Sequence, residues 1–411
     1  LQKSLKLPNF IEKTEIKGPY LNFFINKYFL AEKTISKILK EKENYGSSNL
    51  GKGKTIVIDM SSPNIAKPFG IGHLRSTIIG NSIANISKKI GFKVIKINYL
   101  GDWGTQFGKL ISGYKHFGNK KELNKDPINY LYSLYVKVNS IPELEDESRM
   151  WFKKLEDGNQ ECIKLWKNFR KLSLKEFNKI YKLLNVKFNV ISGESFYNNK
   201  MDKTIELLNN KGLLEQNQGA IIINLEKYDL GICLIKKSDN ATLYITRDIT
   251  AAIDRQNKYK FSKMFYEVGS EQKLHFSQLF KVLELIGFNW AKECKHIDHG
   301  LYLDNDGKKF ATRKGKTVFM IDILNETIDL AKKTIEEKNP KLKNKDKVAK
   351  IVGVAAIVYG DLKNNRSTNM VFDLEKFLDF EGNTGPYLQY AYVRAVNILK
   401  KSKEKSKSSK I

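Results

Sequence analysis

Apolar residues along residues 55–100 follow a pattern that predicts a strand, a helix and a second strand. Residues 55–60 are a short apolar run, and residues 92–100 read as the second strand. Between them, a helix is predicted by apolar side chains three or four positions apart: Leu74, Ile78, Ile79, Ile83, Ile86 and Ile90. Gly91 is the expected residue just after the helix end. This order predicts a parallel βαβ unit with a right-handed connection.

Further along the chain, helical patterns alternate with short strand patterns. Residues 132–200 are charged and carry apolar residues at helical spacing, which favours a packed helical insertion. Residues 220–224 and 231–235 are separated by a turn-like segment and predict a β-hairpin. From Ile321 onward the pattern is again helical. The chain therefore reads as an α/β protein with added helical parts.

The turn between the first strand and the helix, residues 61–77, carries the clearest chemistry. Gly72 lets a ligand approach the backbone, and the N–H groups and dipole of a helix start favour phosphate. His73 can donate a hydrogen bond to a phosphate oxygen, and Lys67 can add a positive charge. Taken alone, this Gly-x-Gly-His sequence is weak evidence, because a histidine at a helix start is more often a cap or a packing residue.

The composition agrees with a partner that carries phosphates. The chain has 72 Lys and Arg side chains against 45 Asp and Glu, a formal net charge of +27. Each neutralised phosphate of a nucleic acid releases counterions, so this excess favours RNA. Only 8 of the basic residues are arginine, and the abundance of lysine, asparagine and isoleucine is also what an AT-rich coding sequence produces. The charge therefore indicates attraction to RNA rather than sequence readout.

Cysteine and histidine positions argue against disulfides and a metal centre. The three cysteines are far apart and form no Cys-x-x-Cys pair: Cys162, Cys233 and Cys294. A reduced compartment is the expectation. His296 and His299 would face opposite sides of a strand, whereas a structural zinc needs four converging ligands, so we predict no protein metal site. The longest apolar run, residues 351–360, is well short of the ~20 residues of a membrane span.

Eight segments resemble class I aminoacyl-tRNA synthetases, and arginyl-tRNA synthetases in particular, in the same order along the chain. They are SSPNIAKPFGIGHLRST (61–77), GDWGTQFG (101–108), PELEDESRMWFKKLEDG (142–158), SLKEFNKIYKLLNVKF (173–188), LYITRDITAAIDR (243–255), VGSEQKLHFSQL (268–279), KKFATRKG (308–315) and FEGNTGPYLQYAYVRA (380–395). Ordered matches of this extent exclude coincidence. The resemblance covers nearly the whole chain.

The resemblance implies a doubly wound, Rossmann-like parallel sheet in a class I catalytic domain, with a helical insertion and a C-terminal helical bundle. The implied divisions are residues 1–50, the remnant of an N-terminal additional domain and its linker; 51–131, the first half of the catalytic domain; 132–200, the insertion; 201–320, the second half of the catalytic domain; 321–380, the bundle that contacts the tRNA stem; and 381–411, the start of the anticodon-binding domain. The chain begins with Leu, and we expect that its start is truncated.

The implied activity is arginine–tRNA ligase. The carboxylate of L-arginine attacks the α-phosphate of ATP and releases pyrophosphate, and the arginyl group then passes to the 3′ end of tRNA(Arg). Both steps need positioning and charge neutralisation more than a protein nucleophile. The resemblance implies ATP as a substrate with Mg²⁺, the partners tRNA(Arg) and L-arginine, no membrane, and a monomer in the cytoplasm.

The implied site residues fall into three groups. The catalytic residues are Lys67, Gly72, His73, Arg313 and Lys314. The residues for arginine are Asp59, Ser62, Asn64, His73, Tyr244, Asp248 and Gln272. The residues for ATP are Gly70, Gly72, His73, Lys309, Thr312, Arg313 and Lys314. Asp248 would supply the carboxylate that a guanidinium requires, and without the family context it reads as a helix N-cap. Tyr99, Trp103 and Gln106 are further candidates for the pocket, with core packing as the alternative for the aromatic residues.

The chain departs from the family pattern in both signatures. Gly70 stands in place of the first histidine of the His-x-Gly-His signature. Thr312 stands in place of the second lysine of Lys-Met-Ser-Lys-Ser, and Lys67 is the substitute that the resemblance implies. We expect a working site in which Lys67 and backbone N–H groups at Gly70 carry more of the phosphate binding.

Two other functions stay open at this point. The first is another adenylate-forming enzyme of the same fold, which would share the turn at His73 but need no Asp248. The second is an inactive or truncated synthetase-like fragment that binds RNA, which the replacement at Gly70 motivates.

Overall fold

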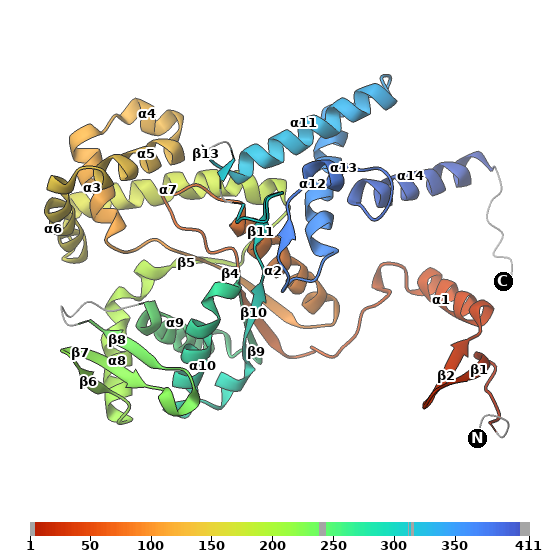
Figure 1. Cartoon of the computed structure of the whole chain (residues 1–411), viewed down its shortest axis with the longest axis horizontal. Coiled ribbons are helices and arrows are strands. Elements are labelled where there is room, and N and C mark those ends of the chain that lie inside the picture. Colours follow the sequence, from red (N-terminus) through yellow and green to blue (C-terminus); the bar gives the residue numbers. More distant parts are fainter. Residues whose placement is uncertain (1–4, 238–243, 311, 314–315, 403–411) are drawn as a thin grey trace.

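The computed structural model describes residues 5–237, 244–310, 312–313 and 316–402 (Figure 1). At its centre, five strands form a parallel sheet in the order β10-β9-β3-β4-β5. They are β3 (Thr55–Asp59), β4 (Lys93–Leu100), β5 (Val190–Gly193), β9 (Lys263–Gly269) and β10 (Cys294–His299). The strand order reverses between β3 and β9, and in doubly wound sheets a ligand binds beyond the carboxyl ends of the strands at this point. The expectation of a doubly wound parallel sheet is confirmed.

The predicted βαβ unit consists of β3, α2 (Gly72–Lys89) and β4. Residues of β3 alternate between two cores, since Ile58 packs on the α2 side of the sheet and Val57 on the opposite side. The helix lies very close to the end of the strand, because a Cβ added at Gly80 would be 2.6 Å from the Cβ of Met60. This close packing fixes where the first turn of α2 meets the carboxyl end of β3.

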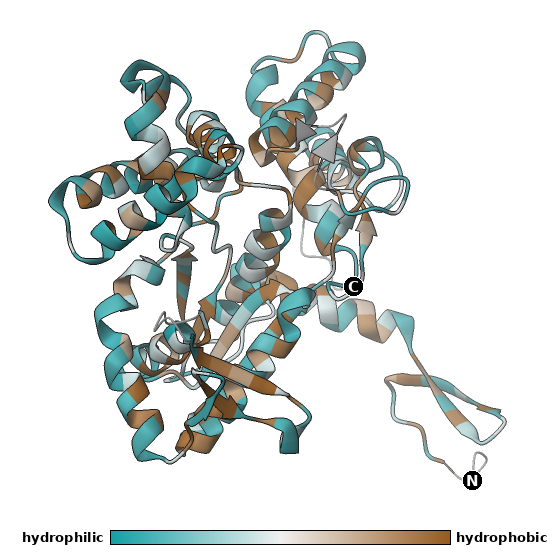
Figure 2. Cartoon of the chain, turned by 60° about the vertical axis from the view of Figure 1, so that its left-hand side comes forward, coloured by the Kyte–Doolittle hydropathy of each residue, from teal (hydrophilic) through white to brown (hydrophobic). Residues whose placement is uncertain are grey.

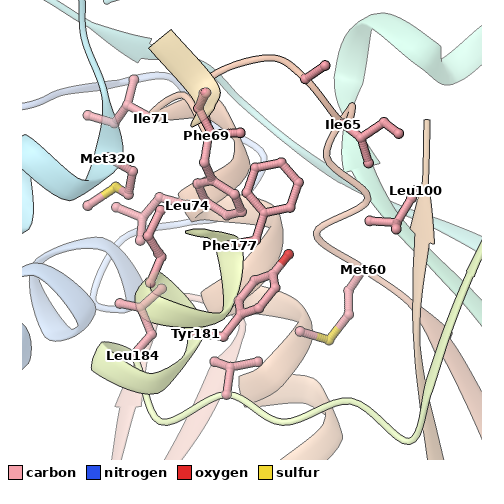
Figure 3. Packing of buried hydrophobic residues seen from close by; sticks show 14 of the residues in the cluster. Met60, Ile65, Phe69, Ile71, Leu74, Leu100, Phe177, Tyr181, Leu184 and Met320 are labelled. Carbon is pink, nitrogen blue, oxygen red and sulfur yellow. The ribbon is translucent and has the colours of Figure 1, made fainter. Parts of the chain in front are cut away.

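Five helices between β4 and β5 form a separate layer (Figure 1). They are α3 (Gln106–Phe117), α4 (Lys120–Lys125), α5 (Pro127–Asn139), α6 (Glu145–Glu156) and α7 (Gln160–Leu183). The insertion is helical as predicted, but its expected limits need correction, because α5 crosses the boundary at residue 132. At the other end, β5 lies inside 132–200 yet hydrogen-bonds with β4 in the central sheet. Figure 3 shows Phe177 and Tyr181 of α7 packed among residues of the turn and α2.

The segment from α8 to α10 covers the opposite face of the sheet. It contains α8 (Met201–Asn210), β6 (Glu215–Asn217), β7 (Ala220–Asn224), β8 (Ile232–Lys236), α9 (Tyr244–Tyr259) and α10 (Lys273–Ile286). The predicted hairpin is confirmed as the antiparallel pair β7–β8, to which β6 adds a third strand that the sequence pattern did not indicate. Buried residues of α9 and α10 share one core with Val57.

The C-terminal part is helical, as predicted. Short strands β11 (Tyr302–Leu303), β12 (Thr312–Arg313) and β13 (Lys316–Thr317) precede α11 (Met320–Lys338) and α12 (Lys345–Leu362), and β14 (Met370–Val371), α13 (Leu374–Leu378) and α14 (Gly385–Lys401) follow. The helix predicted to open at Gly385 and Pro386 is α14, and Thr384 caps it by accepting a hydrogen bond from the N–H of Tyr387.

The N-terminal part extends away from the rest of the described chain (Figures 1 and 2). It consists of the hairpin β1 (Ile11–Lys17) and β2 (Tyr20–Ile25) followed by α1 (Lys27–Glu41). The sequence pattern indicated the helix but not the hairpin. No residue of α1 is buried. Across the described residues, every helix is too short or too polar to cross a membrane.

Candidate active site

A cleft of about 440 Å³ opens at the carboxyl ends of β3 and β9, where the strand order reverses. Its walls come from the turn after β3, the start of α2, the ends of β9 and β10, and the segment around Lys309. Of the residues expected to contact substrates, the cleft is lined by Ser62, Gly70, Gly72, His73, Gln272 and Lys309. Residues far apart in the sequence therefore meet at one site.

The turn after β3 is held in an unusual backbone conformation. Ser61, Ser62 and Ala66 have positive φ angles of 72°, 46° and 58°. The N–H of Ser61 donates to Oγ of Ser76 in α2 (2.9 Å), and the N–H of Ala66 donates to Oγ of Ser173 in α7 (2.9 Å). Non-glycine residues keep such angles only where the surroundings fix them, and strain of this kind clusters at functional sites. The insertion thus helps to shape the wall of the cleft.

The start of α2 is suited to phosphate. Gly72 is the first residue of the helix, and no side chain caps the helix start. A Cβ added at Gly70 or Gly72 would have no atom from another part of the described chain within 4 Å, so the open space reaches the backbone itself. The N–H groups of His73 and Leu74 donate to the carbonyl oxygens of Gly70 (3.1 Å) and Ile71 (3.0 Å), so it is the helix dipole at this point that favours a negative charge.

His73 lines the same end of the cleft and is a neutral group at physiological pH. Burial, with a smaller contribution from nearby His299, lowers the pKa of His73 to about 4. Its Nδ1 is buried and has no hydrogen-bond partner among the residues that the structure describes. His73 can therefore offer hydrogen bonds to a ligand, but it adds no positive charge.

Lys67 and Asn64 do not line the cleft. The Nζ of Lys67 lies 5.2 Å from the centre of the Tyr135 ring in α5, and Asn64 packs against Gly101. In this conformation, Lys67 is therefore not among the residues that line the cleft in which it is expected to contact phosphates. In the second signature, Thr312 and Arg313 form β12, which pairs with β13, and Lys314 lies outside the described residues.

Asp248 lies within α9 and is not its N-cap, because the helix already begins by Tyr244. Tyr244 precedes it by one turn on the same face, as expected for a helix. Oδ2 of Asp248 is 2.8 Å from Nε2 of His275 in α10, and the two side chains are 23% and 24% exposed. Asp248 is thus fixed in place while its carboxylate remains accessible.

Both carboxylate oxygens of Asp59 already have partners within the protein. Its Oδ2 is 2.7 Å from a guanidinium nitrogen of Arg255, and its Oδ1 accepts a hydrogen bond from Oγ of Ser62 (2.9 Å). The expected support for the substrate ammonium group would therefore pass through Ser62, which lines the cleft, rather than come directly from Asp59.

Glu194, which the sequence analysis missed, is a second carboxylate close to Asp248. The pKa of Glu194 is raised to about 8, mainly by burial; Arg247 opposes this increase, and Asp248 contributes to it. A carboxyl group with such a raised pKa beside another carboxylate is typical of a functional site. Glu194 directly follows β5, and the prediction of helix over 132–200 hid this strand end.

Asp102, in the GDWGTQFG segment, anchors the loop that carries Glu194. It is fully buried and accepts hydrogen bonds from the N–H of Ser195 (2.9 Å) and from Nε of Arg170 (2.9 Å). Trp103, the next residue, is packed against Phe152 and Trp166 of the insertion. Trp103 is therefore a core residue, as the alternative interpretation held.

Two further side chains that line the cleft are His299 and Glu267, whose Nδ1 and Oε1 are 2.9 Å apart. His296, the other histidine of this strand, instead contacts the carbonyl oxygen of Val268 (3.0 Å). The two histidines thus have different partners, as expected for opposite faces of a strand.

Comparisons with known proteins agree on one family. The family model described as tRNA synthetases class I (R), catalytic domain, matches residues 34–374. The arginine–tRNA ligase of Enterococcus faecalis is 54% identical over 395 residues, which cover 95% of this chain and 70% of the relative. The arginine–tRNA ligase of Clostridium perfringens is 52% identical over 397 residues, 96% of this chain and 70% of the relative.

Solved structures give the same picture at the level of the fold. The crystal structure of arginyl-tRNA synthetase from Plasmodium falciparum matches with a TM-score of 0.81 and 26% identity, covering 97% of this chain and 69% of that chain. The arginyl-tRNA synthetase of Thermus thermophilus has a TM-score of 0.80 at 22% identity, covering 98% of this chain and 73% of that chain, and shares the fold.

Proposed function

The chain belongs to the class I arginyl-tRNA synthetase family and is an arginine–tRNA ligase, and we propose that its cleft is where arginine and ATP react. The arginine carboxylate attacks the α-phosphorus of ATP, pyrophosphate leaves, and a ribose hydroxyl at the 3′ end of tRNA then takes the arginyl group. In both steps the protein orients the reactants and stabilises negative charge on the phosphates.

The observation that carries this proposal is that Glu194 lies close enough to Asp248 for this carboxylate to raise its pKa, although neither residue is among those that line the cleft. A guanidinium carries forked donors that bind best to carboxylates sheltered from water. Glu194 is partly buried, and His275 fixes Asp248. We assign these two carboxylates to the arginine side chain, together with Tyr244, one turn before Asp248 in α9, and with Ser62 and Gln272, which line the cleft.

ATP phosphates are assigned to the start of α2. Gly70 and Gly72 leave the backbone open, and neutral His73 adds hydrogen bonds. Because Gly70 has no side chain, the phosphates can lie closer to the backbone than they could beside a histidine. Lys309, which also lines the cleft, supplies positive charge, and Thr312, Arg313 and Lys314 remain assigned to the same step.

Mg²⁺ would enter with ATP rather than occupy a site of its own. Among the described residues, no three His, Cys, Asp or Glu side chains are grouped as metal ligands. Glu271 at the wall of the cleft can supply one carboxylate oxygen, and phosphates and water suit the remaining positions of a hard cation. The ion would neutralise phosphate charge.

The proposal extends to tRNA, oligomeric state and compartment. Lys167, Arg170, Lys171 and Lys175 of α7 line an open groove, which suits the phosphates of a tRNA end. One chain holds all the residues assigned above, which supports action as a monomer. The three cysteines are free and buried, in keeping with the reducing cytoplasm.

The function is tested by ATP–pyrophosphate exchange with arginine, lysine and other amino acids, each with and without tRNA. Of the amino acids tested, only arginine should support exchange. Exchange with another amino acid would favour a different adenylate-forming enzyme, and RNA binding without exchange would favour the inactive alternative.

The arginine pocket is tested by Asp248→Asn. Loss of a charged hydrogen-bond partner should raise the KM for arginine by about 10- to 100-fold and leave the KM for ATP unchanged. Asp254→Asn is the matched control, because Asp254 lies on the same helix but pairs with Lys200 at 3.4 Å. An equal change in both variants, or an unchanged KM for arginine in Asp248→Asn, would remove Asp248 from the pocket.

A further inference from the structure

The cleft contains a buried pair of side chains that neither phosphate binding nor arginine recognition uses. Glu267 lies near the end of β9 and His299 ends β10, and both line the cleft. Nδ1 of His299 is 2.9 Å from Oε1 of Glu267, and the side chains are 8% and 0% exposed. In the parallel register His299 is opposite Gly269, so the pair sits at the carboxyl edge of the sheet.

This pair presents unused hydrogen-bonding capacity to the cleft. Oε2 of Glu267 is buried and has no hydrogen-bond partner within the described part of the chain. The carboxylate at Nδ1 holds the ring proton on that nitrogen, which leaves Nε2 as an acceptor. The hydrogen bonds described for His299 involve Nδ1 and not Nε2. Buried polar groups without partners are uncommon, and at a cleft they indicate a ligand.

The charge of the pair decides which part of ATP it fits. With His299 neutral the pair has one negative charge, and with His299 protonated it has none, so it offers no net positive charge to a phosphate. The phosphates are assigned instead to Gly72 and Lys309, which line the same cleft. Val268, Leu301 and Phe310 give the same cleft an apolar surface of the kind that a purine ring covers.

We propose that His299, positioned by Glu267, accepts a hydrogen bond from the exocyclic amino group of adenine and thereby selects ATP over nucleotides that lack this amine. The inference rests on the proposed function, because it takes ATP to bind in this cleft. A guanine nucleotide carries a carbonyl oxygen at the same position, and two acceptors facing each other disfavour its binding.

Three variants and one control test the role of the pair. Glu267→Leu combined with His299→Phe removes both polar groups at similar volume and leaves no unpaired buried charge. His299→Asn keeps an amide donor near the position of Nδ1 for Glu267 but does not reach the position of Nε2, and Glu267→Gln keeps an acceptor for Nδ1. The control is His116→Phe, since His116 also pairs with a carboxylate, that of Glu147 at 2.8 Å, on the insertion surface. Thermal unfolding shows whether each variant is folded.

The readouts are the KM values for ATP and arginine, and equilibrium binding of ATP, 2′-deoxy-ATP, GTP and purine riboside triphosphate, which lacks the amine. The double variant and His299→Asn should weaken ATP binding about tenfold, while Glu267→Gln and the control stay within about threefold of wild type. The KM for arginine should not change. The loss should disappear with purine riboside triphosphate, and discrimination against GTP should fall.

Two results would overturn the inference. One is unchanged ATP binding in the double variant. The other is a loss that persists with purine riboside triphosphate but disappears with 2′-deoxy-ATP, which would place ribose at His299. Because nucleotide binding is measured without turnover, this outcome is separate from failure of the proposed function, which would appear as wild-type protein without arginine-dependent exchange.

Discussion

At the scale of single residues, burial sets the protonation of the groups around the cleft. His73 is neutral because burial lowers its pKa to about 4, and Glu194 is mostly protonated at pH 7 because burial raises its pKa to about 8. The first group cannot repel a cation or attract an anion by charge. The carboxyl group of Glu194 would lose its proton when a guanidinium binds beside it, because a positive charge favours the ionised carboxylate.

Arginine binding should therefore release a proton from Glu194. A guanidinium favours the ionised carboxylate, so affinity rises as pH increases through about 8 and levels off above it. Between pH 9 and pH 7 we expect about a tenfold weakening of arginine binding. Calorimetry in two buffers of different ionisation enthalpy measures the released proton directly.

The control for this prediction is Glu194→Gln, which has no carboxyl group to titrate. It should bind arginine more weakly at pH 9 and lose most of the dependence on pH. Arginine binding by the wild type that is independent of pH from 7 to 9, or a dependence that survives in Glu194→Gln, would rule out this role.

Residue-level prediction from the sequence succeeded where a local rule applies. Gly91 has a φ of +95° just after α2, as its place after the apolar helix pattern indicated. Glu194, Glu267 and His299 were not predicted as site residues. Their roles depend on burial and on partners that are distant in sequence. Glu267 and His299, for example, are 32 positions apart.

At the scale of elements, helix α2 contains two glycines in different surroundings. Gly72 at its start is open to the cleft, and Gly80, two turns later, is tightly packed. Gly72 faces open space, whereas Gly80 packs against Met60, the residue that follows β3. The same residue type thus serves ligand access at one position and helix packing at the other.

Gly72→Ala should impair ATP binding without destabilising the fold. Its added methyl group enters the cleft where phosphate approaches the backbone, so we expect the KM for ATP to rise about tenfold or more. The melting temperature should stay the same, because the new Cβ has no atom of another described segment within 4 Å.

Gly80→Ala provides the matched comparison on the same helix. Its Cβ would lie 2.6 Å from that of Met60, so overpacking should lower the free energy of unfolding by about 1–3 kcal/mol. The KM for ATP should change little. The assignment of the phosphate site to α2 would be wrong if the two variants had the reverse effects.

Element prediction was most accurate where the hydrophobic period is strong, as for α2, the hairpin β7–β8 and α12. The short strand β5 was absorbed into a predicted helical insertion, because four residues carry too little pattern to be distinguished from their helical surroundings. Its place in the sheet comes from pairing with β4, a contact that lies far away in sequence.

At the scale of the whole molecule, a buried ion pair joins the catalytic sheet region to the C-terminal bundle. Nε of Arg75 in α2 lies 3.0 Å from Oδ2 of Asp361 in α12, and both side chains are 1% exposed. The hydroxyl of Tyr302 donates to the same carboxylate oxygen, and Arg75 also donates to the carbonyl oxygen of Gly300 (2.8 Å). The position of the cleft wall at Tyr302 thus depends on both parts.

Asp361→Asn should leave the charge of Arg75 buried and uncompensated. We expect a loss of about 3–5 kcal/mol in the free energy of unfolding, measured by urea denaturation. Adding Arg75→Met removes that charge, and the asparagine oxygen still accepts from Tyr302, so the double variant should recover part of the loss. A loss of less than about 1 kcal/mol for Asp361→Asn would show that the pair does not hold the two parts together.

The central claim is that this chain attaches arginine to tRNA through the site described above. The most direct measurement is charging of tRNA in a mixture of all twenty amino acids with ATP, followed by identification of the attached amino acid. Arginine should be the only amino acid attached by the wild type, and the amount should fall sharply in Asp248→Asn but not in Asp254→Asn. Attachment of another amino acid, or no attachment by folded protein that binds both ATP and tRNA, would contradict the account.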